Sequence, residues 1–571
     1  MLLVTTADER TWDDKDEILF LGDWCRLAKR REAWEGLKAQ VVPYHWNDRA
    51  KMHRDAAMLS ERYEALLPNL AALLDAAHGT QHGTSYWRLV AGPWLRLMMA
   101  VLWDRSEGIQ RAIAAGATRT RVFSNAKLPA LSFDAMADAA QADDLWNHAL
   151  AAAIIARAGR LAVESAGVAV PSPLPQARPA GWKDRLRGAL RLVARLRPRS
   201  VFFCNMYAKP RVLLGLELAL GQIPAIAGAP MPREFTADPE RRNSFRLDCG
   251  DDLFGLALSD ILPAAFPATL LEGYAALRRE GRAIFPETAK AIVTANAQHN
   301  ELFCIWAAEQ RAKGVPLAVV QHGGHYGTDL IEQQEEHERA SADAFISWGW
   351  PHASDKVLPL PALKLQGLPS ACGTNDGDFY CVFDSGHRYP NRIYCVPFGG
   401  QRIADNALQL DMLAALPAPA RQTLRVRCHP NDDGFGFRAQ IAAAGLSGAF
   451  DTAPSMALGL QSARLCLVGC PSTSLLEAMA SGVPTLALYD ARFGEERLEA
   501  KPYFDALRAA GILHHSTESV TAQIAKIWPD PKAWWSQPDV AQAHRDFVRR
   551  FAWTVPDWRR RWRDALKALA R

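Results

Sequence analysis

The chain has 571 residues, of which 49% are hydrophobic and 22% charged, so it is too long for one hydrophobic core and too apolar for a mostly disordered protein. Lys and Arg total 66 against 62 for Asp and Glu, and so small an excess of positive charge argues against bulk binding of nucleic acid. We therefore expect a globular protein with two large domains.

Cysteine usage and the start of the chain indicate a reducing compartment. The ten cysteines form no CxxC pair, and the first residues lack the basic start and apolar stretch of a signal peptide. The most apolar run, 86–103, contains two arginines and a Gly-Pro, which would be costly in a bilayer. We expect a cytoplasmic protein. The basic, Trp-bearing stretches 182–199 and 557–571 suit an anionic membrane surface on the inner face of the membrane, although ordinary solvated helices remain the alternative.

Two strands, each followed by a polar loop, open the chain. The run 17–21 precedes Asp23, and the run 40–44 precedes Asp48. Ligand sites of parallel α/β sheets lie beyond the carboxyl ends of the strands, so Asp23 first and Asp48 second are candidate catalytic carboxylates. A nucleophile would retain the configuration of the transferred centre and a general base would invert it. The alternative is that each aspartate only caps the following helix.

The rest of the chain predicts further α/β structure. Residues 49–169 are Ala- and Leu-rich with apolar positions three and four apart, which predicts a helical insertion. Short β-prone runs follow at 201–204, 291–294, 317–320, 344–347, 379–383, 393–396, 424–428, 464–468 and 484–488. A small, polar stretch favours a domain boundary near 375. We expect domains at 1–375 and 376–550, and a C-terminal helix at 551–571 that packs back on the N-terminal domain.

A hydroxyl-rich turn is the strongest candidate site. After the strand at 464–468 come Ser472, Thr473 and Ser474, and a helix that carries Glu477 follows. Free amides at the start of a helix, together with hydroxyl donors, can hold a phosphate, although Ser and Thr are also ordinary caps. The run E-x-x-A-x-G-x-P from Glu477 resembles the nucleotide-binding helix of GT-B glycosyltransferases, in which the carboxylate accepts hydrogen bonds from a ribose.

A His-Pro pair follows the strand at 424–428. The proline holds His429 in extended geometry, so its imidazole can project from the sheet edge and donate to a phosphate oxygen. The pair resembles that of polysialyltransferases, capsule 3-deoxy-octulosonate transferases and polyol-phosphate transferases, whose His-Pro and Ser/Thr elements bind a cytidine nucleotide.

A glycine-rich, histidine-bearing loop follows the strand at 317–320. In the run QHGGHYG, three glycines within five residues permit close approach of the backbone. His322 could polarise the leaving phosphate or act as a general base, and Gln321 and Gly323 are further candidates for donor contact.

These segments, with FLGDWC at 20–25, PYHWNDR at 43–49, HGTSYWRLVAGPW at 82–94 and ISWGWP at 346–351, resemble a bacterial family of surface-carbohydrate transferases first named from a leptospiral protein. The resemblance spans nearly the whole chain. It implies a GT-B fold of two Rossmann-like domains facing a central cleft, with the donor on the C-terminal domain and the acceptor on the N-terminal domain. The family in turn resembles, more distantly, transferases that use CMP-activated 3-deoxy-2-keto sugars.

The resulting hypothesis is a glycosyltransferase that moves an octulosonate or nonulosonate from a CMP donor to a surface polysaccharide or a lipid-linked precursor. The sequence has no convincing D-x-D, HExxH or P-loop, so we expect neither a metal nor a cofactor beyond the CMP-activated sugar. Two alternatives stay open. One is a UDP-sugar, GDP-sugar or CDP-polyol phosphate donor, and the other is a non-catalytic polysaccharide-assembly scaffold at the membrane surface.

Overall fold

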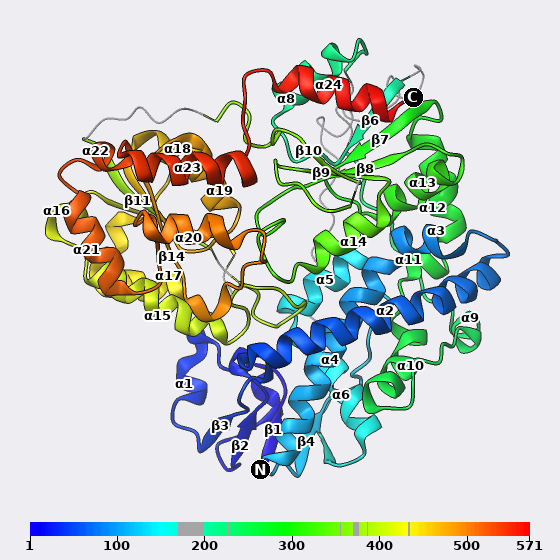
Figure 1. The fold of residues 1–571 in the computed structure, drawn as a ribbon. Coiled ribbons are helices and arrows are strands. Elements are labelled where there is room, and N and C mark those ends of the chain that lie inside the picture. Colours follow the sequence, from blue (N-terminus) through cyan, green and yellow to red (C-terminus); the bar gives the residue numbers. More distant parts are fainter. Residues whose placement is uncertain (170–198, 225–227, 355, 369–375, 385, 432–433) are drawn as a thin grey trace.

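The computed structural model describes residues 1–169, 199–224, 228–354, 356–368, 376–384, 386–431 and 434–571. The predicted α/β class is confirmed, because the strands of the described residues form parallel sheets. There are three five-stranded sheets (Figure 1). The predicted boundary near 375 and the basic stretch 182–199, apart from its last residue, lie outside the described residues.

The first sheet has the strand order β3-β2-β1-β4-β5. Its strands are β1 Leu2–Val4, β2 Ile18–Phe20, β3 Ala39–Val41, β4 Arg119–Val122 and β5 Ala162–Ser165. Its helices are α1 Arg31–Trp34, α2 Arg49–His78, α3 Gly83–Val90, α4 Gly92–Ala114, α5 Phe133–Ala142 and α6 Asp144–Ala158. The prediction of a purely helical insertion at 49–169 was therefore wrong, because this segment also supplies β4 and β5.

Charged side chains explain why the apolar pattern of the sequence did not predict β4 and β5. On β4, Arg119 donates to Glu164 of β5 at 3.0 Å, and Arg121 donates to the same carboxylate at 3.4 Å. Residues of β5 are mostly exposed, as expected at a sheet edge. Cross-strand ion pairs, instead of alternating apolar side chains, hold this edge together.

The second sheet has the order β10-β9-β8-β7-β6. Its strands are β6 Arg199–Cys204, β7 Ala289–Thr294, β8 Leu317–Val320, β9 Ala344–Ser347 and β10 Val357–Pro359. Its helices are α8 Pro210–Ala219, α9 Pro239–Ser244, α10 Leu253–Ala265, α11 Ala268–Leu271, α12 Tyr274–Ile284, α13 Glu301–Ala312 and α14 Gln333–Ser341. The segment 1–375, expected as one Rossmann-like domain, thus contains two separate sheets.

The C-terminal helix α24, Trp558–Leu569, lies over α8 of the second-sheet unit (Figure 1). Trp558, Trp562 and Leu566 form its buried stripe, and the Trp562 indole donates to the carbonyl of Pro361 at 2.7 Å. The apolar face of 557–571 is therefore packed against protein, and its arginines face outward. None of the described helices combines the length and apolarity needed to span a bilayer.

The third sheet has the order β12-β11-β13-β14-β15. Its strands are β11 Asp378–Phe383, β12 Leu424–Cys428, β13 Ala463–Val468, β14 Thr485–Leu488 and β15 Leu513–His514. Its helices are α15 Gln401–Ala414, α16 Ala418–Gln422, α17 Phe437–Ile441, α18 Met456–Ser462, α19 Thr473–Ser481, α20 Lys501–Ala509, α21 Thr517–Ile527, α22 Pro531–Trp535 and α23 Pro538–Phe551.

One expected strand of this unit, 393–396, is absent from the described sheets. The segment is buried but makes only an isolated bridge, between Tyr394 and Glu332. Pro390 and Pro397 bracket it, and proline cannot donate to a strand ladder, so an apolar run here does not become a strand.

The carboxyl edges of the second and third sheets face each other, whereas the first sheet docks beneath the third (Figure 1). Trp24 packs against Tyr389 with ring centroids 5.7 Å apart, and Tyr44 packs against Phe398 at 6.0 Å. Two Rossmann-like units facing a cleft match the predicted arrangement. The first sheet is an addition whose carboxyl edge is covered by the segment 386–402.

Candidate functional site

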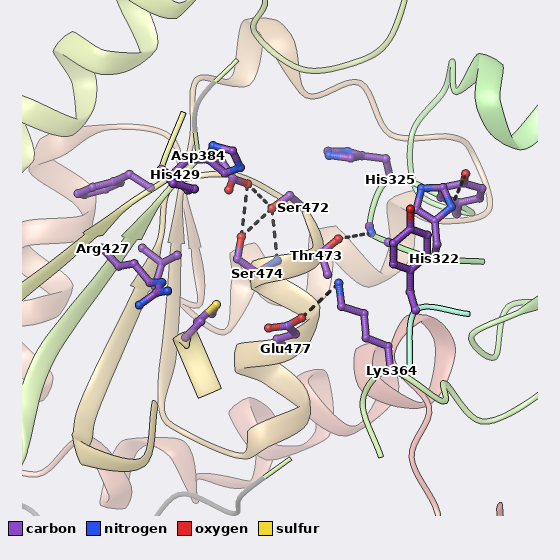
Figure 2. Close-up of a pocket in the computed structure, with 18 of the residues that line it drawn as sticks. His322, His325, Lys364, Asp384, Arg427, His429, Ser472, Thr473, Ser474 and Glu477 are labelled. Atoms are coloured by element: carbon purple, nitrogen blue, oxygen red, sulfur yellow. Dashed lines mark hydrogen bonds and ion pairs between the residues drawn. The ribbon is translucent and has the colours of Figure 1, made fainter. Parts of the chain in front are cut away.

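A cavity of about 510 Å³ lies between the second and third sheets (Figure 2). Its volume falls within the range of small-molecule sites. The second-sheet unit contributes Tyr207, His322, Gly323, Gly324, His325, Tyr326, Glu332, Gln334 and Lys364. The third-sheet unit contributes Val382, Phe383, Asp384, Arg392, Arg427, Cys428, His429, Pro430, Met456, Ser472, Thr473, Ser474 and Glu477. The structure thus brings the predicted His-Pro pair, hydroxyl turn and glycine-rich loop to one place.

The hydroxyl turn starts α19 directly after β13. Ser472 is the N-cap, with extended backbone, and its hydroxyl accepts the amide of Ser474 at 3.4 Å. The start of α19 lines the cavity, and the helix dipole places partial positive charge there. This is the geometry of an anion cradle.

The protons of the three hydroxyls are not equivalent. Ser472 donates to the carboxylate of Asp384, and the hydroxyls of Ser472 and Ser474 lie 2.7 Å apart, so the protons of both serines stay within this cluster. Thr473 instead accepts the amide of Gly324 at 2.8 Å, which leaves its own O–H to donate to a ligand. Of the trio, Thr473 is the hydroxyl best suited to bind a phosphate oxygen.

His429 follows β12 and lines the same cavity (Figure 2). Its Nδ1 accepts the backbone amide of Asn431 at 3.2 Å, so a neutral ring carries its proton on Nε2. Nε2–H is a donor, as a phosphate ligand requires. The nearby Arg427 is paired with Asp451 at 2.8 Å and adds positive charge at the base of the cradle.

The glycine-rich loop after β8 closes the cavity from the other side. A side chain at Gly324 would lie 2.4 Å from the carbonyl carbon of Ser472, and one at Gly323 would lie 2.8 Å from the Thr473 hydroxyl. Only glycines permit this contact between the two walls. His325 has a φ of 72°, a costly conformation for a residue with a side chain and one that is concentrated at functional sites.

Gln321, predicted to contact the donor, does not line this cavity. It is buried, and its side-chain oxygen accepts the amide of Trp348 at 2.9 Å and the indole of Trp350 at 2.8 Å, while its amide nitrogen donates to Gly323. Gln321 therefore shapes the loop from behind by linking it to the ISWGWP segment.

The two histidines of the loop have opposite electrostatic surroundings. Burial lowers the pKa of His322 to about 3, so this ring is neutral near pH 7. Burial also acts to lower the pKa of His325, but the Asp329 carboxylate, 2.9 Å away, reverses the effect and the net pKa is raised. His325 can therefore supply positive charge where His322 cannot.

Glu477 lies one turn into α19 and faces the cavity, as expected (Figure 2). Its carboxylate lies 3.5 Å from the ammonium of Lys364, which reaches across from the second-sheet unit. Arg392 of the third-sheet unit also lines the cavity. Two cationic side chains thus stand beside the cradle, from opposite walls.

The structure does not bring the two predicted carboxylates Asp23 and Asp48 to this cavity. Asp23 pairs with Arg26 and approaches Gly400 so closely that a side chain there would meet its carboxylate. Asp48 is exposed and caps α2, accepting the amide of Lys51 at 2.9 Å. Both lie at the carboxyl edge of the first sheet, and that edge faces protein instead of the cleft.

Several cavity residues were absent from the sequence-based site, and three of them carry charge beside the cradle: Asp384, Lys364 and Arg392. For Asp384 a signal was present, because it directly follows the strand at 379–383, as Asp23 follows its own strand. Lys364 and Arg392 lie in irregular segments with no motif around them. Among the described residues, no group of three His, Cys, Asp or Glu side chains is arranged to hold a metal ion.

Three solved structures show distant likeness. WaaG, a glycosyltransferase involved in lipopolysaccharide biosynthesis, is 12% identical with a TM-score of 0.29 over 64% of this chain and 99% of its own. MurG of Acinetobacter baumannii is 10% identical with a TM-score of 0.34 over 65% and 100%. A point mutant of the Thermobaculum terrenum O-GlcNAc transferase is 15% identical with a TM-score of 0.29 over 87% and 98%.

No curated protein matches the chain. The sequence profile of the LIC12162 family transferases, in contrast, matches residues 1–566. The two facing Rossmann-like units and the cavity between them are what the family resemblance of the sequence implies. The chain therefore belongs to the LIC12162 family of transferases.

Proposed function

We propose that the protein is a glycosyltransferase that moves an acidic 3-deoxy-2-keto sugar from a CMP donor onto a bacterial surface polysaccharide or its lipid-linked precursor. The observation that supports this most directly is the convergence of His429 and the turn Ser472–Ser474 on one cavity with Glu477. His429 and the turn follow different strands. If each had only a structural role, they would not need to line the same cavity.

The cavity offers a partner for each part of such a donor. The amides of α19, the hydroxyl of Thr473 and Nε2–H of His429 suit the single phosphate. Glu477 suits the ribose hydroxyls, which would replace its contact with Lys364. Lys364, once released, and Arg392 suit the carboxylate that distinguishes an acidic sugar from a neutral one.

The same groups supply a catalytic contribution. Negative charge grows on the phosphate as the glycosidic bond to it breaks, and preorganised donors aimed at that oxygen lower the barrier. One oxyanion donor is worth about 100- to 1000-fold in rate in enzymes that rely on this effect. His429, Thr473 and the helix amides occupy this role here, and metal independence is part of the proposal.

A panel of nucleotides in a thermal-shift assay tests the donor. A ligand at 100 times its dissociation constant stabilises the folded state by about 2.7 kcal/mol, so CMP should raise Tm by several degrees and His429→Ala should reduce the shift to about half or less. A shift with UDP or GDP but not CMP would contradict the cytidine donor, and a shift with CDP alone would favour polyol-phosphate transfer. No shift with any nucleotide would favour the scaffold alternative.

The scaffold alternative has its own test in cells. If His429→Ala and Glu477→Ala leave glycan production intact while deletion of the whole chain abolishes it, catalysis at this cavity is not what the cell needs. The transferase proposal expects both variants to behave like the deletion.

A further inference from the structure

A chain of hydrogen bonds along the wall of the cavity begins at Arg392. Its Nη1 donates to the side-chain oxygen of Gln334, on α14, at 3.0 Å. A guanidinium has only donors, so this contact fixes which end of the Gln334 amide is the oxygen. The amide nitrogen must then point the other way.

The nitrogen of Gln334 points at His322. It lies 3.4 Å from Nε2 of the imidazole. An amide nitrogen can only donate, so Nε2 of His322 must be the acceptor of this long contact and cannot carry a proton. In the neutral ring, the proton is therefore on Nδ1.

The other side of the ring agrees with this assignment. Nδ1 lies 3.2 Å from the hydroxyl of Tyr326, and that hydroxyl donates to Oε2 of Glu338 at 3.0 Å. With Tyr326 donating to Glu338, its oxygen accepts from His322, which agrees with a proton on Nδ1. Glu338 is fully buried, and its Oε1, 3.9 Å from Nδ1, has no hydrogen-bond partner among the described residues.

His322 and His429 thus present opposite faces to the cavity. His429 presents an N–H, and His322, whose side chain is 24% exposed, presents at Nε2 a lone pair that now accepts the Gln334 amide at 3.4 Å and that an acceptor hydroxyl would have to take over. A lone pair repels a phosphate oxygen but accepts the proton of a hydroxyl. Of the two roles that the sequence left open for His322, polarising the phosphate and acting as a base, this geometry favours the base.

We propose that Nε2 of His322 receives the proton of the acceptor hydroxyl, and that Gln334, Tyr326 and Glu338 are positioning residues that hold the ring in the required tautomer. This inference rests on the proposed glycosyl transfer. The hydroxyl oxygen forms a bond to the anomeric carbon as the bond from that carbon to the phosphate oxygen breaks, and the electron pair of the broken bond leaves on CMP. The hydroxyl proton moves to Nε2 and is later released to water. This single displacement inverts the anomeric configuration.

The neutral state of His322 is compatible with this step. Burial lowers the pKa of the ring to about 3, so Nε2 is unprotonated across the physiological range, although the ring is a weak base. A weak base suffices, because a hydroxyl oxygen becomes strongly acidic as it bonds to an electron-poor carbon. Asp384 is the rival base in the cavity, because its Oδ2 accepts the hydroxyls of Ser472 and Ser474 while a carboxylate has further lone pairs on its other oxygen.

Release of CMP from CMP-activated 3-deoxy-octulosonate, with water as the acceptor, tests the base. We expect His322→Ala to lower kcat by about 100-fold or more, the size of a general-base contribution, while the Kd for CMP changes less than about threefold. Full turnover in His322→Ala would overturn the proposal. If the wild-type protein neither binds CMP nor releases it, the donor proposal fails instead, and the tautomer remains measurable.

The tautomer is tested by nitrogen NMR of protein labelled with ¹⁵N-histidine, with His322→Ala to identify the signal. We expect an unprotonated Nε2 and a protonated Nδ1 in the wild-type protein. Tyr326→Phe should lose the preference for a proton on Nδ1 and lower kcat at least about tenfold without changing CMP affinity. Glu338→Gln keeps an oxygen that can accept from Tyr326, so this variant should retain the preference. Tyr63→Phe, at another buried tyrosine, is the matched control. A proton on Nε2 in the wild-type protein would overturn the proposal.

Discussion

The two walls of the cavity are built in different ways. The third-sheet wall includes three residues in the loops that follow strands: Asp384 after β11, His429 after β12 and Ser472 after β13. The second-sheet wall depends on side chains that contact one another, from Gln334 on α14 through His322 to Tyr326. Backbone geometry orients one wall, and a side-chain network orients the other.

This difference teaches where substitutions should act. Backbone amides at a helix start survive the loss of a single side chain, so variants on the third-sheet wall should lose affinity in steps. In a side-chain network, the loss of one member leaves its neighbours less well oriented. Variants on the second-sheet wall should therefore alter turnover while leaving nucleotide affinity intact. Substitutions on each wall, and a change of pH, can test that division.

Gly324→Ala should have the largest effect, because it breaks the contact between the walls. Its new methyl group would lie 2.4 Å from the carbonyl carbon of Ser472, and neither backbone can yield without opening the cavity. We expect activity to fall more than about 100-fold and the free energy of unfolding to fall by about 1–3 kcal/mol, the cost of overpacking. Gly448→Ala, where the structure leaves open space, is the control and should be unchanged.

His429→Ala should be next. Loss of a hydrogen bond to a charged phosphate costs about 1.5–3 kcal/mol, or roughly 10- to 150-fold in the Kd for CMP measured by calorimetry. Stability should be little affected. An equal loss of affinity in His322→Ala would contradict the division between the walls.

Acid should destabilise the folded protein through its buried histidines. Burial lowers to about 3 the pKa of His322 and the pKa of His337, which lies on α14. Below about pH 6.5 these histidines therefore bind protons in the unfolded chain but not in the folded chain. The free energy of unfolding should therefore fall as pH falls, by about 1.4 kcal/mol per pH unit for each such histidine. His337→Gln should reduce the slope of stability against pH by about one proton, as measured by denaturant titration. An unchanged slope would show that His337 is not neutral in the folded state.

The hydroxyls of the cradle should give the smallest and most selective effects. Thr473→Val removes the one hydroxyl with a proton to offer, and should weaken CMP binding about tenfold, equivalent to about 1.4 kcal/mol. Ser474→Ala should change the Kd less than about threefold, because the proton of that serine stays within the Asp384 cluster. Thr473→Ser should restore binding. The reverse ranking would show that Asp384 releases the serine protons when a phosphate arrives.

Sequence patterns predicted most of the third sheet and its wall. Four of its five strands are buried apolar runs or end at a distinctive turn. The sequence therefore predicted both these strands and the functional residues that follow them. The sequence did not predict the edge strand β5 and its neighbour β4, because the ion pair between Arg119 and Glu164 replaces the apolar alternation. Tertiary contacts decide such edges, and these contacts leave no local signal.

The site shows the same limit. The rule that functional residues follow parallel strands placed His429 and Ser472 correctly and also selected Asp23 and Asp48, because it cannot tell which sheet edges face each other. The network around His322 joins a loop to α14 through Tyr326 and Glu338, and Glu338 carries no motif of its own. Only the tertiary structure reveals it.

The segment 386–402 contacts the first sheet on one side and delivers Arg392 to the cavity on the other. The first-sheet unit therefore packs against the segment that carries this guanidinium, far downstream in the chain. A truncated protein that keeps only the second- and third-sheet units should retain the phosphate cradle. Without the first sheet, we expect the imidazole of His322, which Arg392 orients through Gln334, to be misaligned.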